Sequence, residues 1–353
     1  MKASLYILLF FLVLSCKDGK QNLKEAQNVP SESKSFDYSL VGKETLRLAE
    51  KIAKVNEVMS SAVYEAGVKP EQYKTFEALT AKASTPELKA LLGYPNNAVK
   101  CYSFWALTLR RDKDCFDILK EYLQDTSRVD TQFGCIGSST TIGDFYLDLL
   151  TPNYVGLDSY KLDKAQQKQI DSLLIFDKTI QLSAKTSLLN KIKPNEHYYS
   201  RVKQILQEEG NEAALIALAK YRKPEDKTFI LSFLNDPEKE YYGIKAVKFF
   251  PAPEFLEPLA QIQAREIMKD TGFDYSLYRE MYQAMVQFKN KESAELLEKP
   301  FTKATQDARP YHLEYIWLAI EKYPNTLYSR IQSKIQLTEY EKEDLNYWLK
   351  EVE

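Results

Sequence analysis

The chain has 353 residues, of which 28% are charged and 44% hydrophobic, which is ordinary for a globular protein. Its formal net charge of −2 gives no electrostatic footprint for nucleic acid, and no dense basic stripe is present, so nucleic acid is not expected as a partner. Two histidines exclude a histidine-rich metal centre, and 11 glycines favour helices over a turn-rich β-sandwich.

Residues 1–15 are typical of a secretory leader. Lys2 supplies a positive charge, and an apolar run follows from Leu5 to Leu14. The run is too short for a membrane-spanning helix, which needs roughly 20 apolar residues. We therefore predict that residues 1–15 are a signal peptide.

The end of this leader, Leu-Val-Leu-Ser-Cys, resembles the lipobox of bacterial lipoproteins. Val13 and Ser15 match the motif, whereas Leu14 is bulkier than the usual residue there. The resemblance implies lipidation of Cys16 and an anchor in the cell envelope, at the periplasmic or surface face of the outer membrane. Two or three acyl chains form a stable anchor. The alternative is an ordinary secretory leader with an incidental cysteine.

Residues 16–40 are polar and show no apolar periodicity, which predicts a disordered tether between the lipid and the folded part. From Lys43 onward, apolar residues recur at helical spacing. They predict a long helix that ends near Gly67. Two shorter helices are expected over 70–83 and 86–92.

An internal repeat follows. Residues 103–107 and 214–218 are similar, and residues 118–125 match residues 229–236 at the same offset of 111. Three further pairs of a small and an apolar residue begin at Ala246, Ala284 and Ala319. These spacings indicate a unit of about 37 residues, the length of a helix pair.

The junctions Leu88–Leu107 and Leu231–Val247 resemble HEAT repeats. In each, a leucine-rich helix end leads through an Asn- or Asp-containing break to a helix with a basic residue and a small-apolar pair. The resemblance implies an all-α fold, an α-solenoid of HEAT-like helix pairs with an irregular middle segment. A compact, non-repeating helical domain is the alternative.

The expected organisation is N-terminal repeats over 41–150, an irregular insertion over 151–205 and C-terminal repeats over 206–353. Within the insertion, one helix is expected at 164–174. Residues 126–150 are read as a degraded unit. Long irregular insertions in repeat arrays often carry the binding function.

Three cysteines follow the leader cysteine. Cys101 and Cys135 are the candidate disulfide, and Cys115 would remain free; the alternative is burial of all three as small apolar residues. No Cys-x-x-Cys spacing occurs, so zinc binding is not predicted. The segment 134–141 lacks the Gly-Lys-Ser/Thr end of a phosphate-binding loop and is expected to be a turn between helices.

Other candidate sites are weak, and we expect no catalytic, cofactor or metal site. His197 and His312 are isolated and are expected at surfaces or interfaces, because no Gly-x-Ser-x-Gly elbow accompanies them. Asp144 and Asp148 share a helix face, which is read as solvated. Three tyrosines are expected to fill the core, since each lies about one turn before a packing alanine: Tyr102, Tyr242 and Tyr315.

The sequence favours a non-enzymatic, membrane-anchored scaffold or adaptor whose partner is another envelope protein. Its binding surface would be the second helices of the pairs, near 112–124, 224–235, 253–267, 290–299 and 325–335. The alternative is a lipoprotein that binds a glycan or peptide through residues 126–200. An enzyme would require a histidine beside Ser, Cys and Asp in a cleft.

Overall fold

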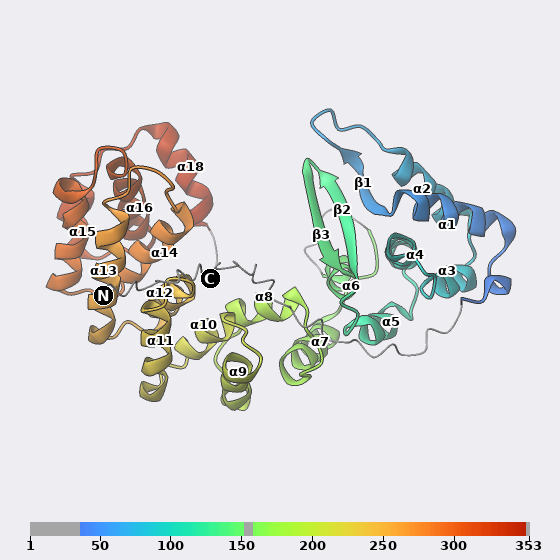
Figure 1. The fold of residues 1–353 in the computed structure, drawn as a ribbon, viewed down its shortest axis with the longest axis horizontal. Coiled ribbons are helices and arrows are strands. Elements are labelled where there is room, and N and C mark those ends of the chain that lie inside the picture. Colours follow the sequence, from blue (N-terminus) through green and yellow to red (C-terminus); the bar gives the residue numbers. More distant parts are fainter. Residues whose placement is uncertain (1–35, 152–157, 351–353) are drawn as a thin grey trace, which may run out of the picture. The chain divides into compact units, whose positions relative to one another are not determined.

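A computed structural model describes residues 36–151 and 158–350. The predicted leader, Cys16 and the tether up to residue 35 lie outside the described residues. The elements below belong to one compact unit, Tyr38–Glu353. The described part is mostly helical and contains one small sheet (Figure 1). Across 36–151 and 158–350, no helix has both the length and the apolarity needed to cross a bilayer.

The N-terminal elements show where the predicted long helix is wrong. Helix α1 ends at Val55 because Asn56 adopts a left-handed conformation with φ 58°, which Asn tolerates better than most residues. A strand then follows instead of a further helical turn. The first elements are η1 (Tyr38–Leu40), α1 (Lys43–Val55), β1 (Glu57–Val63), α2 (Glu71–Lys82) and α3 (Thr85–Leu91).

The sheet makes the fold not purely all-α, which corrects the expected fold class. Strand β1 pairs in parallel with β2 (Arg128–Gly134), and β2 pairs antiparallel with β3 (Ile136–Thr141). The segment 134–141, expected as a turn between helices, is instead the tip and second strand of a hairpin. Gly134 permits the turn because its φ is +58°.

Helices α2, α4 and α6 lie against this sheet (Figure 1). Tyr102 on α4 joins the two layers: its hydroxyl donates to the carbonyl of Met59 at 2.9 Å and accepts from the amide of the same residue at 2.6 Å. The middle helices are α4 (Asn97–Leu109), α5 (Cys115–Tyr122), α6 (Ile142–Leu150), α7 (Lys164–Phe176), α8 (Ser183–Lys191) and α9 (Glu196–Glu208).

The segment expected to be irregular contains more helix than the sequence indicated. The helix predicted at 164–174 is confirmed as α7, and α8 and α9 follow it. Strong caps explain these starts: Asp163 forms a capping box with Gln166 at the start of α7, and Asn195 accepts a hydrogen bond at the start of α9. Residues 152–157 lie outside the described residues.

The C-terminal half consists of helices, several of which are preceded by a 3₁₀ turn. These elements are α10 (Ala213–Ala219), η2 (Pro224–Asp226), α11 (Lys227–Leu234), α12 (Glu240–Phe249), η3 (Pro253–Phe255), α13 (Leu256–Glu266), α14 (Tyr275–Met285), α15 (Lys291–Lys303), α16 (Arg309–Lys322), η4 (Thr326–Tyr328), α17 (Ser329–Gln332) and α18 (Glu339–Leu349). Helices are thus present in the C-terminal ranges predicted at 224–235, 253–267, 290–299 and 325–335.

Alternate helices form a continuous row. Each of α4, α6, α8, α10, α12, α14, α16 and α18 contacts the next member of this series. The helices α11, α13, α15 and α17 contact members of the row and lie between them in the sequence. Every residue of α10 is buried, as expected for a helix with neighbours on all sides.

Positive φ angles recur after three helices. Arg111 follows α4 with φ 54°, and Arg222 follows α10 with φ 53°, at the offset of 111 residues found in the sequence. Lys289 has φ 52° after α14. Left-handed conformations are uncommon outside glycine, so their recurrence at one place in the unit indicates a shared turn.

The tyrosines expected in the core do pack there. Tyr102 is fully buried, and Tyr242 and Tyr315 are partly buried against the C-terminal core. Further fully buried aromatic side chains stabilise the same half by removing a large apolar area from water: Tyr278, Tyr282, Tyr328 and Phe255.

Candidate functional site

A cavity of about 500 Å³ lies between the sheet and the helices that it covers. We call it the sheet pocket. Its size is within the range of about 300 to 1,000 Å³ that is usual for small-molecule sites. It is lined by Ser60, Ser61, Tyr73, Trp105, Thr131, Phe133, Ser138, Thr140, Phe145 and Asp148.

Aromatic rings surround Trp105 of α4. The Tyr73 ring from α2 lies 6.1 Å away and the Phe145 ring from α6 lies 6.3 Å away, both close to perpendicular to the indole. The Phe133 ring from β2 is 6.0 Å away and tilted by only 20°. Trp105 is 3% exposed. Rings from four elements therefore meet at different orientations in one place.

The sheet supplies hydroxyl groups. Thr131 on β2 and Ser138 on β3 are paired across the hairpin, and their hydroxyl oxygens are 2.8 Å apart. Thr140 lies two residues beyond Ser138, so it belongs to the same face. Ser60 and Ser61 of β1 complete this wall. The pocket thus combines apolar surface with hydroxyl groups that both donate and accept hydrogen bonds.

Asp148 is the carboxylate of the sheet pocket. Its side chain is solvent-accessible, but the protein around it partly desolvates the carboxylate, and this desolvation, followed by the charge of Asp144, raises the pKa of Asp148 to about 6. Within residues 36–151 and 158–350, no side chain forms an ion pair or hydrogen bond with its carboxylate.

Asp144, one helical turn earlier, has a different role. Its carboxylate accepts hydrogen bonds from the amides of Ser183 at 3.0 Å and Ala184 at 2.9 Å, at the start of α8. It also accepts from the hydroxyl of Thr141 at 2.8 Å. The interpretation of Asp144 and Asp148 as a solvated face is wrong for Asp144, which is buried and joins two helices, whereas Asp148 is exposed and lines a cavity.

The spacing of four residues identified Asp144 and Asp148 as carboxylates on one helix face. Nothing in the sequence indicated the pocket that Asp148 lines. The other members come from β1, α2, α4, β2 and β3, which are distant in the chain. No local pattern could indicate that these segments converge.

The three described cysteines are free thiols, and the candidate disulfide between Cys101 and Cys135 is not formed. Cys101 is fully buried in α4, and burial raises the pKa of its thiol. Burial also raises the pKa of the Cys115 thiol to about 12. Cys135 is exposed at the hairpin tip. The alternative, burial as small apolar residues, is confirmed for Cys101 and Cys115.

The two histidines are in opposite environments. His197 is exposed on α9, as expected. His312 is fully buried in α16, where its Nδ1 lies 2.8 Å from the hydroxyl of Tyr282. Burial lowers the pKa of His312 to about 4. His312 is therefore a neutral core residue and does not lie in the sheet pocket.

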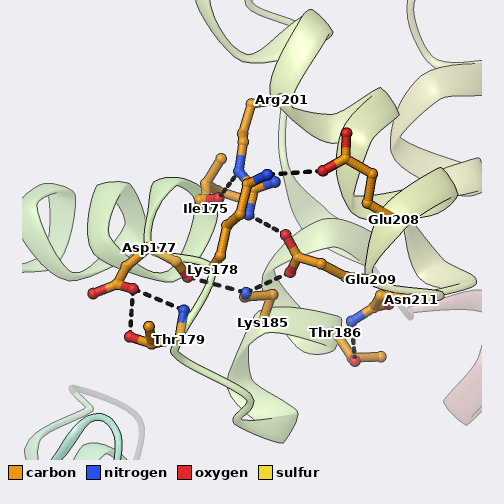
Figure 2. Close-up of polar contacts among 10 residues, drawn as sticks. All are labelled: Ile175, Asp177, Lys178, Thr179, Lys185, Thr186, Arg201, Glu208, Glu209 and Asn211. Atoms are coloured by element: carbon orange, nitrogen blue, oxygen red, sulfur yellow. Dashed lines mark hydrogen bonds and ion pairs between the residues drawn. The ribbon is translucent and has the colours of Figure 1, made fainter.

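A second cavity, of about 640 Å³, lies beside α8 and the end of α9. Figure 2 shows the polar contacts next to it. Glu209 accepts hydrogen bonds from Lys185 at 2.9 Å and from Arg201. Arg201 also donates through Nε to the carbonyl of Ile175 at 2.8 Å, and Lys185 donates to the carbonyl of Asp177 at 3.3 Å.

These contacts form one connected network, which links the end of α7, α8 and α9. Lys185 and Arg201 are 3% and 6% exposed, and both charges are directed to one carboxylate. Burial would raise the pKa of Glu209, but the bonds from Lys185 and Arg201 outweigh it and lower that pKa. We therefore interpret this cluster as a structural joint between α7, α8 and α9.

Among the residues that the structure describes, no three His, Cys, Asp or Glu side chains are grouped so that they could hold a metal ion. Comparison with family models, with curated proteins and with solved structures finds no match for this chain.

Proposed function

We propose that this chain is a ligand-binding lipoprotein of the bacterial cell envelope, anchored through lipid on Cys16, and that its ligand occupies the sheet pocket. The observation that carries this proposal is the Asp148 carboxylate, which lines an aromatic cavity and has no side-chain partner among the residues that the structure describes. Partial desolvation makes the charged form of Asp148 less favourable than it is in open water, as its raised pKa indicates, so pairing with a cationic or donor group would stabilise it. A bound ligand would provide that pairing.

The composition of the pocket supports binding of a small organic group, such as a sugar residue or a peptide side chain. Ligand sites are mostly apolar and carry a few placed polar groups that fix orientation. The sheet pocket has four aromatic rings, five hydroxyl groups besides that of Tyr73, and one carboxylate. Most of its residues belong to the segment around 126–150, where an irregularity in the repeat indicated a binding role. We propose binding without turnover.

The test uses two matched tryptophan substitutions on β3. Thr140 faces the pocket, whereas the neighbouring Ser139 faces the opposite side of the sheet. Mature wild-type protein, Thr140→Trp and Ser139→Trp would be screened by thermal unfolding against glycans and short peptides. We expect a stabilising compound for wild type and for Ser139→Trp, and loss of that stabilisation for Thr140→Trp. Equal responses of the two variants would contradict the proposal.

A second candidate function, a scaffold for another envelope protein, is favoured by the row of helices from α4 to α18. Successive contacts between alternate helices, with intervening helices packed beside them, are what a HEAT-like solenoid would give. We propose this finer architecture for the described helices. In such an array, the helices α11, α13, α15 and α17 would present the surface for a protein partner.

The scaffold is tested by crosslinking the lipidated protein in its native envelope. Charge reversal at exposed sites on α13 and α15, Glu257→Lys and Glu295→Lys, should abolish a specific crosslink that Thr140→Trp leaves intact. A crosslink lost only in Thr140→Trp would assign the partner to the sheet pocket instead.

A further inference from the structure

The chemistry of the sheet pocket restricts the charge of its ligand. Asp148 is the only Asp, Glu, Lys, Arg or His that lines the described cavity, so the fixed charge of the pocket is negative. Two cations lie near the pocket but outside its lining: Lys69 is 5.7 Å from the Tyr73 ring and pairs with Glu77 at 2.7 Å, and Lys161 donates to the carbonyl of Leu149 at 2.9 Å. An anionic ligand would meet the Asp148 carboxylate and no cation among the lining residues.

Two further features add to the negative potential. Asp148 lies in the last turn of α6, and the C-terminal end of a helix carries a partial negative charge. Asp144, one turn earlier, is a second carboxylate on the same helix. The helix end and Asp144 thus both add negative potential near Asp148, and the charge of Asp144 contributes to raising its pKa.

The aromatic walls suit a cation as well. The face of an aromatic ring is the negative side of its quadrupole, and ammonium groups are attracted to it within about 6 Å of the ring centre. Trp105 and Phe145 are only 3% and 4% exposed, so the rings that a ligand can reach are mainly those of Tyr73 and Phe133, which are half-buried and lie 6.1 Å and 6.0 Å from the Trp105 ring.

We infer that the ligand of the sheet pocket presents an ammonium group, which lies against the aromatic walls around Trp105 and pairs with the carboxylate of Asp148. This inference rests on the proposed ligand-binding function. An amine on an apolar body, such as the terminus or lysine side chain of a peptide, has this chemistry, whereas a neutral glycan or a carboxylic acid does not.

The test compares three probes that share a phenylethyl or phenylmethyl body and differ in charge: 2-phenylethylamine, 2-phenylethanol and phenylacetate. Affinities would be measured by calorimetry at pH 8, with mature wild-type protein, Asp148→Asn and Asp117→Asn. Asn keeps the shape of Asp without its charge. Asp117 is an exposed carboxylate on α5 outside the pocket, so its variant makes the same change in net charge.

We expect wild type and Asp117→Asn to bind the amine at least about tenfold more tightly than the alcohol, with phenylacetate weakest. In Asp148→Asn, this preference should fall to within about threefold. If the alcohol or a glycan binds in the pocket and the amine gains nothing, the inference is wrong and the proposed function stands. If no probe, glycan or peptide binds, the proposed function fails, and the inference fails with it.

Discussion

Glu209 holds two buried cations in place, and this makes it the most sensitive charged residue of the joint between α7, α8 and α9. Lys185 and Arg201 both direct their charges to it (Figure 2). Removing one partner from a buried ion pair leaves the remaining charge uncompensated, and this costs more than the pair itself contributes.

We therefore predict that Glu209→Gln lowers the free energy of unfolding by about 3 kcal/mol. The neighbouring Glu208 is the control, because its contact with Lys178 is between side chains that are more than half exposed. Glu208→Gln should cost less than about 1 kcal/mol. Urea unfolding followed by circular dichroism measures both, and equal losses would show that the joint contributes no special stability.

His312 couples the stability of the C-terminal half to pH. Its folded pKa is about 4, lowered by burial from the ordinary value of 6.5. Below pH 6.5 the unfolded chain takes up a proton that the folded protein excludes until about pH 4. Its contribution to stability is thus complete above pH 6.5 and declines as the pH falls toward 4.

Over that window we predict a loss of about 3 kcal/mol from this residue, on the order of 1.4 kcal/mol per pH unit. Comparing wild type with His312→Gln at several pH values isolates the effect, because other groups titrate in both proteins. His197→Gln, at an exposed position, should keep the wild-type slope. The explanation fails if His312→Gln and wild type have the same slope.

At the scale of elements, two glycines lie where one helix closely approaches the end of the helix before it in the chain. A Cβ on Gly143 of α6 would lie 2.8 Å from the carbonyl oxygen of Tyr122, at the end of α5. A Cβ on Gly243 of α12 would lie 2.9 Å from the amide nitrogen of Leu234, at the end of α11. Tyr122-Leu123 and Phe233-Leu234 are the segments related by the offset of 111.

Gly243→Ala should therefore destabilise the protein. Overpacking costs about 1 to 3 kcal/mol, and the higher helix propensity of alanine offsets roughly 1 kcal/mol of it. Gly93→Ala is the matched control, since its Cβ would lie 3.5 Å from the nearest atom, the carbonyl oxygen of Ala90. We expect that control within about 0.5 kcal/mol of wild type. A Gly243→Ala protein as stable as the control would contradict a close approach at this helix crossing.

The elements also show what could be predicted from sequence. The helices after residue 205 were predicted because their apolar spacing is local and recurs along the chain. Strand β1 was not, because its pairing of Glu57 with Asp130 joins residues that are far apart in the sequence. The apolar spacing of the preceding helix also continues without a break to Val58. Helix α1 and strand β1 are separated only by the left-handed turn at Asn56.

The same reason explains the outcome for the candidate site. The segment 126–150 was indicated by its break in the repeat, and it does supply Thr131, Phe133 and Asp148 to the sheet pocket. Trp105 and Tyr73 lie on helices whose aromatic residues resemble ordinary core residues in the sequence. Only the packing of the sheet over α4 and α2 distinguishes them.

At the scale of the whole molecule, the sheet pocket and the row of helices are two separate candidate surfaces. The sheet and the helices beneath it form a pocket with an unpartnered carboxylate, whereas the row that continues from α8 to α18 is occupied mainly by packing contacts. A bound ligand would slow hydrogen exchange of the backbone amides that it covers or orders. One hydrogen-exchange experiment therefore shows whether a ligand binds at the sheet pocket or on the row of helices.

Hydrogen exchange of the mature protein with and without saturating 2-phenylethylamine tests the central claim most directly. We predict slower exchange in β1, β2, β3 and α6, and no change in α11, α13 and α15. Protection confined to those C-terminal helices, or to residues 180–186 and 208–212 beside the second cavity, would contradict the assignment of the ligand site to the sheet pocket.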